Sequence, residues 1–284
     1  MKNLIRFDWA VKRLLRNKAN FGILEGFLSE LIGEDIKIES ILESESNQET
    51  DDDKFNRVDL LVENSKKELT IIEIQNRSEY DYFHRMLYGT SKLISEYLKL
   101  GNPYDKVRKI YSVNILYFDL GHGSDYVYHG KTKFKGIHKQ DQLELSAKQI
   151  EVFHKNEPAQ IFPEYYILKV NRFDDYAKNS LDEWIYYLKN DEIKDEFKAK
   201  GLAEAKELLK LDKLSDKERL AYKRYWENQS LESSMLNTLK IDAEDIIRKE
   251  EKNEIAKKCL QKGMNVNDIS DLTGLSASEI EKLK

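Results

Sequence analysis

Acidic side chains inside two short apolar segments constrain the fold of this chain more than any other feature. Asp59 stands within VDLLV, and Glu73 and Gln75 stand within TIIEIQ. Burying a charge without a partner is costly, so these acids need a structural or chemical reason. Both segments have the length and the branched side chains of strands, and a polar turn separates them. We therefore interpret residues 58–63 and 69–77 as a β-hairpin.

The register of this hairpin decides whether the two acids meet. Side chains on a strand alternate between faces. If Glu63 pairs with Leu69, Asp59 lies directly opposite Glu73, with Cβ atoms about 4.5–5.5 Å apart. That pairing needs an odd number of turn residues, such as Asn64–Glu68. An even number would place the two acids on opposite faces.

Two opposed carboxylates repel each other, and a divalent cation is their simplest stabiliser. Oxygen ligands favour Mg²⁺ or Mn²⁺ over zinc. Mg²⁺ keeps several waters, and one of these can be made acidic and directed at a phosphorus atom. Gln75 follows on the same face and can position water or a phosphate oxygen, but it supplies no positive charge. The alternative interpretation is the solvated face of a surface hairpin.

The rest of the chain predicts a mixed α/β core followed by a helical tail. Helical periodicity covers residues 8–32, with a stop at Gly33, and again residues 79–100. Further strands are expected at 36–42, 109–120, in YVYHGKTKFKGI after the GHGSD loop, and at 164–173. The acidic segment 43–56 reads as a surface loop, and from about residue 180 the pattern is helical. The inward stripe of helix 79–100 is predicted to contain Tyr82, Phe83, Met86, Leu87, Leu93, Ile94, Tyr97 and Leu98.

Five motifs in a fixed order carry a family resemblance over roughly residues 5–175. They are ILEGFLSELIG, VDLLVEN, IIEIQNR, YFHRMLYGTSKL and VNILYFDL. In this order they resemble the PD-(D/E)XK nuclease superfamily, in particular the PD-(D/E)XK family transposases related to recombination-promoting nucleases. The resemblance implies a restriction-endonuclease-like core, α-β-β-β-α-β, with a mixed sheet flanked by helices. We expect this nuclease-like domain at 1–190 and an all-helical region at 191–284.

The same resemblance implies roles for individual residues. Asp59 and Glu73 would bind Mg²⁺, for which Mn²⁺ may substitute, and Gln75 would stand where the superfamily motif has lysine. Glu25, within LEGF, falls where many members carry a helix acid. The motif proline is replaced by Val58, and glutamine stabilises developing negative charge only weakly.

The implied activity is that of a metal-dependent DNA endonuclease. It would hydrolyse phosphodiester bonds, leave 5′-phosphate ends, and serve transposition or recombination. The alternative is a catalytically weak or inactive nuclease fold that acts as a DNA-binding or oligomerising module.

Contacts with DNA would have to come from local basic groups, because the net charge is −5. Arg77, His84 and Arg85 follow the acids and are candidates for phosphate contacts, with a solvated helix face as the alternative for His84 and Arg85. The run KTKFKGIHK at 131–139 is either a backbone contact or a solvated edge strand. The histidines at positions 122, 129, 138 and 154 fit no zinc-binding pattern.

The segment 254–284 has the pattern of a small helix-turn-helix. Ser276 and Glu279 form the S-x-x-E pattern of a capping box at the start of its last helix. That helix carries two acids, so it is either a DNA contact or a packing or dimer element.

The expected setting follows from what the chain lacks. Cys259 is the only cysteine, which fits a reducing cytoplasm. The sequence shows no apolar signal region and no run long enough for a membrane span. We expect DNA as the partner, no membrane, and possible homo-oligomers.

Overall fold

The structure is a computed structural model that describes residues 4–42, 59–98 and 100–283. It divides into two compact units, Met1–Leu214 and Ser215–Lys284. The first unit extends beyond residue 190, where the sequence placed the end of the nuclease-like domain. The acidic loop expected at 43–56 lies outside the described residues.

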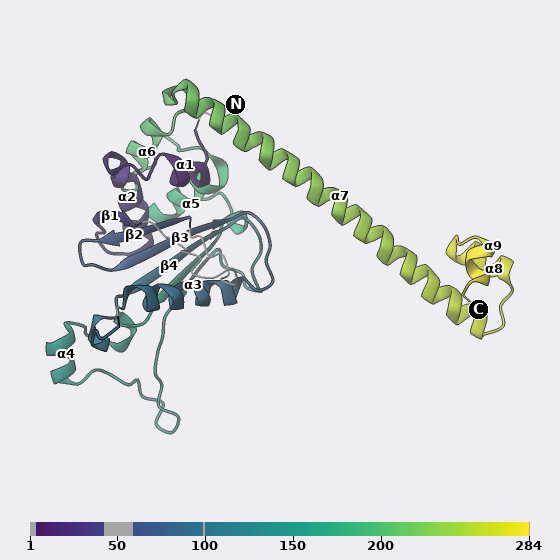
Figure 1. The fold of residues 1–284 in the computed structure, drawn as a ribbon, viewed down its shortest axis with the longest axis horizontal. Helices are drawn as coiled ribbons and strands as arrows, with labels where there is room; N and C mark the ends of the chain where they lie inside the picture. Colours follow the sequence, from purple (N-terminus) through teal and green to yellow (C-terminus); the bar gives the residue numbers. More distant parts are fainter. Residues whose placement is uncertain (1–3, 43–58, 99, 284) are drawn as a thin grey trace. The chain divides into compact units, whose positions relative to one another are not determined.

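A mixed six-stranded sheet forms the centre of the first unit, in the order β1-β2-β3-β4-β6-β5 (Figure 1). The first three strands are antiparallel, β3, β4 and β6 are parallel, and β5 runs antiparallel to β6 at the edge. This mixed sheet confirms the predicted fold class. The strands are β1 (Ile38–Leu42), β2 (Leu60–Asn64), β3 (Leu69–Gln75), β4 (Ile110–Leu116), β5 (Val127–Gly130) and β6 (Glu164–Lys169).

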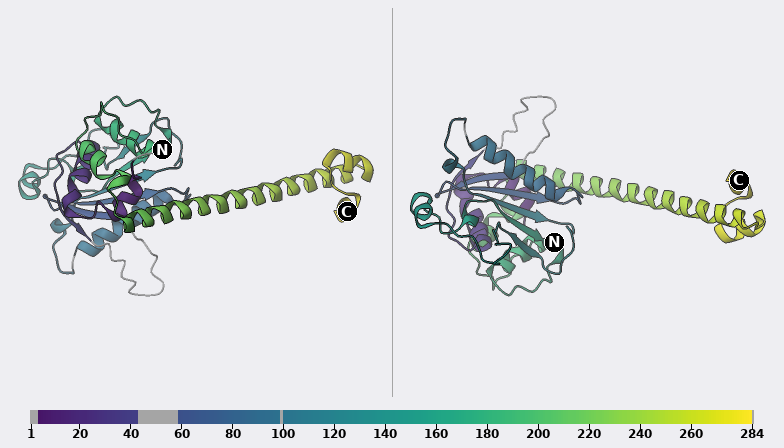
Figure 2. Two further views of the ribbon diagram at one scale, coloured as in Figure 1. Left: turned by 90° about the horizontal axis from the view of Figure 1, so that it is seen from above. Right: turned by 90° about the horizontal axis from the view of Figure 1, so that it is seen from below.

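Helices cover both faces of the sheet. Helix α3 (Tyr82–Tyr97) lies on one face, and the remaining large helices of this unit pack on the other (Figures 1 and 2). Those helices are α1 (Phe7–Arg13), α2 (Phe21–Ile32), α5 (Ser180–Asn190) and α6 (Leu202–Leu208), while α4 (Ala147–Phe153) belongs to the excursion between β5 and β6. Phe7, Phe27, Trp184 and Tyr187 form a buried aromatic cluster between these helices. Edge-to-face packing of such rings adds to the stability that burial supplies.

The single helical pattern over residues 8–32 proves to be two helices. A 3₁₀ turn, Lys18–Asn20, separates α1 from α2. Asn17 accepts a hydrogen bond from the Ala19 backbone N–H at 3.0 Å, and Asn20 donates one to the Leu14 carbonyl at 2.8 Å. These side chains satisfy backbone groups outside a helix, so asparagine breaks the pattern that the apolar residues suggest. Gly33 ends α2 in the left-handed conformation, as predicted.

The inward stripe of α3 is narrower than predicted. Tyr82, Met86 and Leu93 are buried against the sheet, but Phe83 and Leu87 are 53% and 59% exposed. Successive helical residues turn by about 100°, so positions 83 and 87 lie beside the stripe that contacts the sheet. The prediction that they point inward was wrong.

The expected strand or hairpin after GHGSD is also shorter than predicted. Only Val127–Gly130 is a strand, and residues 131–139 form an exposed loop with an isolated bridge between Lys135 and Gln142. The basic run therefore does not form an edge strand.

The second unit consists of α7 (Asp216–Gln261), α8 (Val266–Thr273) and α9 (Ala277–Glu281). Ala256, Ile269, Leu275 and Ile280 form its small core. The predicted capping box is present, since Ser276 and Glu279 exchange hydrogen bonds at the start of α9. No helix in the described parts of either unit combines the length and the apolar character that crossing a bilayer requires.

Candidate active site

The hairpin of β2 and β3 brings Asp59 and Glu73 together. Glu63 pairs with Leu69 and Leu60 with Ile72, so the register places Asp59, directly before β2, opposite Glu73. The predicted pairing of Glu63 with Leu69 is thereby confirmed. Asp59 Oδ2 accepts a hydrogen bond from the backbone N–H of Ile74 at 2.8 Å, which holds the carboxylate against β3.

Asp59 is also contacted by the end of the first helical segment. Lys12 Nζ of α1 lies 2.9 Å from Asp59 Oδ1. Arg16 donates a hydrogen bond to the Asp59 carbonyl oxygen at 2.8 Å. The lysine is half exposed and the carboxylate is largely buried, so this ion pair stands at the rim of the site and is partly screened by solvent.

Glu73 is the most deeply buried acid of the site, with 9% of its surface exposed. The pKa of Glu73 is raised to about 8, mainly by burial, with smaller contributions from the negative charges of Asp59 and Glu79. Arg85 and Lys12 oppose this rise. Arg85 approaches Glu73 Oε2 only to 3.3 Å. Without an additional cation, Glu73 therefore remains mostly protonated near pH 7.

Gln75, Glu79 and Arg85 form a second, connected group. Gln75 Nε2 donates a hydrogen bond to Glu79 Oε1. Arg85 NH1 donates to both carboxylate oxygens of Glu79, at 2.9 and 3.2 Å, while its NH2 faces Glu73. The guanidinium thus links the buried acid of β3 to the acid that precedes α3.

Glu73 and Arg85 line a small pocket together with the uncharged polar side chains of Tyr82, Ser112 and Asn114. Asn114 pairs in register with Glu73 on the neighbouring strand. The Tyr82 hydroxyl donates a hydrogen bond to Asn114 Oδ1 at 3.0 Å, and Asn114 Nδ2 donates to Ser112 Oγ at 3.0 Å. Burial holds the pKa of Tyr82 far above its usual range, so this hydroxyl remains a donor. These contacts fix α3, and with it Arg85, against the sheet.

Glu25 is not brought to the two acids. Its carboxylate accepts hydrogen bonds from the Ile38 backbone N–H at 2.9 Å and from Lys37 Nζ at 3.1 Å. Ile38 pairs with Asn64, at the far end of β2 from Asp59. The distance along the strand from Asn64 to Asp59 is roughly 17 Å. In this conformation Glu25 caps the start of β1 and does not line the site.

The residues expected to contact DNA lie at different places. Arg85 belongs to the site itself. Arg77 is exposed in the turn that follows β3, and His84 is exposed on the first turn of α3. Both therefore lie near the acids along the chain and face solvent.

The donors present fit a hard divalent cation bound mainly through water. Asp59 and Glu73 offer carboxylate oxygens and Gln75 offers an amide oxygen, the ligand types that Mg²⁺ prefers. The high pKa of Glu73 reflects its burial, which Arg85 and Lys12 only partly offset, and a bound cation would lower it. No group of three or more His, Cys, Asp or Glu side chains suited to a metal occurs within 4–42, 59–98 and 100–283. One or two carboxylates are nevertheless the usual protein share of a Mg²⁺ site.

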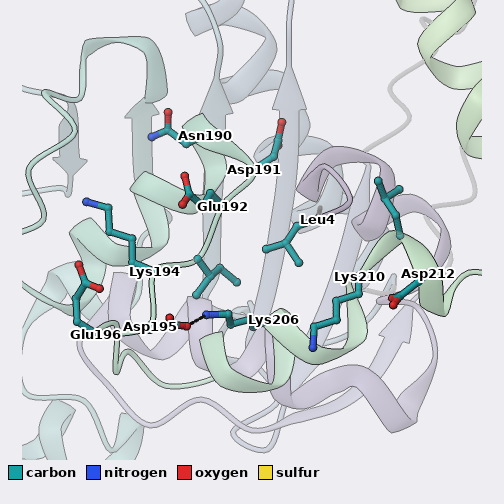
Figure 3. A pocket seen from close by; sticks show the side chains of 12 residues that line it. Leu4, Asn190, Asp191, Glu192, Lys194, Asp195, Glu196, Lys206, Lys210 and Asp212 are labelled. Carbon is teal, nitrogen blue, oxygen red and sulfur yellow. Dashed lines mark hydrogen bonds and ion pairs between the residues drawn. The ribbon is translucent and has the colours of Figure 1, made fainter. Parts of the chain in front are cut away.

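A larger depression lies elsewhere in the first unit and contains none of the predicted site residues (Figure 3). It is lined by Leu4, residues 190–196 and residues of the 206–212 stretch, with Lys206 paired to Asp195. Charges of both signs are mixed along its walls, and no cluster of catalytic type is found there.

Sequence reasoning missed Lys12 and Glu79. Lys12 stands on an exposed helix face, and Glu79 stands in a turn between β3 and α3. Neither position has a local pattern that points to the acids. Only the path of the chain places Lys12 against Asp59 and Glu79 against Gln75.

Comparisons with known proteins give two family matches. A family model described as PD-(D/E)XK nuclease family transposase matches residues 5–238. A second, described as Rpn/YhgA-like nuclease family, C-terminal HTH domain, matches residues 249–284. Neither the curated proteins nor the solved structures returned a match. Because the first match spans most of the 284 residues, the chain belongs to the PD-(D/E)XK nuclease family transposases.

Proposed function

We propose that this protein is a metal-dependent DNA endonuclease whose acidic pair is Asp59 and Glu73. The observation that carries the proposal is the position of the two carboxylates, opposite each other at the end of the β2–β3 hairpin. One of them is buried with a pKa of about 8. A charge-deficient carboxylate of this kind, in a chain of a nuclease family, marks a functional site rather than a solvated surface.

Asp59 and Glu73 would hold the cation, which we expect to be Mg²⁺ with Mn²⁺ as a substitute. When bound, such a cation lowers the pKa of a coordinated water and neutralises charge on the phosphate. Glu73 has to release its proton for this binding, because the ligand form of a carboxyl group is the carboxylate. Arg85 and Lys12 favour that release, since both lower the pKa of Glu73.

Arg85 supplies the positive charge that Gln75 lacks. In the superfamily motif a lysine stands at the position of Gln75, whereas here the guanidinium of Arg85 lies beside Glu73. A fixed cation at this place stabilises negative charge that develops on a phosphate. Gln75 would then orient the attacking water or a phosphate oxygen through its amide.

DNA is the proposed substrate, cleaved to 5′-phosphate ends during transposition or recombination. Arg77 and His84 would contact phosphates beside the cleavage site, and the C-terminal helix-turn-helix would add a second contact. A reducing cytoplasm fits the single cysteine, and self-association remains an expectation of the helical region.

The test is plasmid nicking with Mg²⁺ or Mn²⁺ by the wild type, Asp59→Ala and Glu73→Ala. We expect each variant to lose about 100-fold or more in rate, the order seen when a transition-state contact is removed. Glu144→Ala, an exposed acid in a loop, is the control and should cleave as the wild type does.

Equal cleavage by all four proteins would refute the site. No cleavage by the wild type, with DNA binding retained, would instead favour the alternative, a nuclease fold that serves as a DNA-binding module. This alternative is supported by Gln75, which replaces the motif lysine and stabilises developing negative charge only weakly.

A further inference from the structure

A second concave surface lies on the same face of the sheet as the acids, and none of the roles above uses it. We call it the α3–β6 groove; it has a volume of about 650 Å³, within the size range of ligand pockets. It lies between α3, the loop after β4, and strands β5 and β6. Its lining is Phe83, Met86, Leu87, Leu120, Gly121, His122, Tyr128, His129, Gly130, Tyr165, Ile167 and Lys169.

The sheet register relates the groove to the acids. Glu73 pairs with Asn114 of β4, and Asn114 pairs with Ile167 of β6. In the next row on the same face, Gln75 pairs with Leu116, which pairs with Lys169. Neighbouring strands lie about 4.8 Å apart, so each member of β6 is roughly 10 Å from its counterpart on β3. The groove and the acids therefore lie on the same face of the sheet, with β4 and the buried cluster of Tyr82, Met86 and Leu116 between them.

Apolar side chains line the groove, and those of α3 stay largely exposed among the described residues of the first unit. Phe83 is 53% exposed and Leu87 is 59% exposed, and both face the groove from α3. Across from them, Tyr165 and Ile167 project from β6. Exposed apolar walls of this kind mark binding sites more often than bare surface.

A buried cation stands at one end of the groove. Lys169 is only 2% exposed. Its Nζ lies 3.4 Å from the Gly123 carbonyl oxygen and 5.2 Å from the centre of the Tyr128 ring. Within the described residues no carboxylate lies at ion-pair distance from it, and the nearby Asp119 is bound by Arg172. A buried ammonium group with one weak acceptor is suited to an anion that enters the groove.

We propose that the α3–β6 groove binds an unpaired nucleotide of the DNA strand that is cut. This inference rests on the proposed function and adds a substrate feature to it. The base would pack on Phe83 and Leu87, and the neighbouring phosphate would face Lys169. Aromatic side chains beside a cation are the usual means of holding single-stranded nucleic acid. The consequence is a preference for DNA that is single-stranded or locally unpaired next to the cleavage site.

The test measures binding without cleavage. Fluorescence anisotropy in EDTA compares a labelled single-stranded oligonucleotide with the blunt duplex of the same sequence. Phe83→Ala and Lys169→Met should each weaken single-strand binding about tenfold, while duplex binding changes less than about twofold. Tyr104→Ala and Lys213→Met remove an exposed aromatic and an exposed lysine outside the groove and should change neither affinity.

A second readout locates the nucleotide. Single bases of the oligonucleotide are replaced in turn by abasic positions. We expect the affinity of the wild type to fall at one of these positions. In Phe83→Ala, an abasic site at that same position should no longer change the affinity. Because Phe83 is half exposed, its truncation does not endanger the fold even if Lys169→Met does.

Each outcome decides the proposal separately from the nuclease assignment. Unchanged single-strand binding by both variants, equal losses for single strand and duplex, or no binding of single strands by the wild type would overturn the groove. Groove-dependent binding without any cleavage would support the groove and contradict the endonuclease. If the wild type cleaves DNA and Phe83→Ala changes neither cleavage nor single-strand binding, the endonuclease is supported and the groove is contradicted.

Discussion

Glu73 is the residue of the site whose pKa departs most clearly from its ordinary value among the acids. It stands on a strand that is buried along most of its length, and its nearest cation, Arg85, is shared with Glu79. Burial therefore dominates and the pKa of Glu73 rises to about 8. Without a bound cation, the folded protein therefore favours the protonated form of Glu73 near pH 7.

Folding stability should fall with pH because of this residue. The pKa of Glu73 in the folded state, about 8, lies above the ordinary value of 4.5. The folded state thus holds the proton more tightly, and the stability that this contributes is full below about pH 4.5 and is lost as pH rises through 8. Glu73→Gln is neutral at every pH and should escape this loss. In EDTA, urea denaturation should show the variant gaining on the order of 2–4 kcal/mol relative to wild type between pH 5 and 9.

The control for this comparison is Glu144→Gln, which changes an exposed acid. Its stability relative to wild type should stay constant over the same range. A stability difference between Glu73→Gln and wild type that does not change with pH would show that Glu73 is ionised in the folded protein.

At the scale of elements, the β2–β3 turn sets the geometry of the acids. Asn64 Oδ1 accepts hydrogen bonds from the backbone N–H groups of Lys66 and Glu68 at 3.0 and 2.9 Å, and Lys67 adopts a left-handed conformation. Asparagine commonly stabilises such turns through its own side chain. The resulting turn has the odd length that the cross-strand pair needs, so the acids share a face.

Helix α2 packs against the backbone that precedes α6 through a contact at Gly26. A Cβ added to Gly26 would lie 2.2 Å from the Lys200 carbonyl oxygen and 2.7 Å from Gly201 Cα. Gly201 has a left-handed φ of 83°, and a Cβ added to it would in turn lie 3.1 Å from Gly26 Cα. Close packing of backbone on backbone leaves no flexible atom to move aside.

Gly26→Ala should therefore destabilise the protein although alanine favours helices. Helix propensity alone predicts a gain of about 1 kcal/mol, whereas overpacking of this kind typically costs about 1–3 kcal/mol. We expect a net loss in the free energy of unfolding, measured by urea denaturation. Gly22→Ala on the same helix is the matched control, because its Cβ would meet only the mobile carboxylate of Glu204. Equal stability changes in the two variants would contradict the close contact.

At the scale of the whole molecule, the two compact units and the two family matches divide the chain at different places. The first unit ends at Leu214, the nuclease family match at residue 238, and the helix-turn-helix match begins at residue 249. The domain boundary expected at residue 190 stays a prediction, while residues 191–214 belong to the first compact unit. Each unit has its own core, as domains do.

A chain ending at Thr238 should keep the nuclease fold and lose a DNA contact. We expect an unchanged near-UV spectrum from the aromatic cluster around Trp184, and DNA affinity about tenfold weaker, which corresponds to 1.4 kcal/mol. Anisotropy with a duplex at fixed salt measures the affinity, and size-exclusion chromatography with light scattering measures the oligomeric state. Unchanged affinity together with a smaller assembly would instead identify the C-terminal unit as a packing or dimer element.

The sequence by itself determined the β2–β3 hairpin with its two acids and the capping box of α9, but it left the register of the hairpin open and predicted a longer strand after GHGSD than the structure has. The hairpin and the capping box depend on periodicity, turn residues and capping side chains, which act over a few neighbouring positions. Tertiary structure alone decided which cations reach the acids, since Lys12 and Arg85 come from separate helices. It also placed Glu25 at the start of β1 and exposed Phe83 and Leu87. Such contacts depend on how segments distant in the sequence pack together. The burial that raises the pKa of Glu73 likewise arises only when these segments are packed.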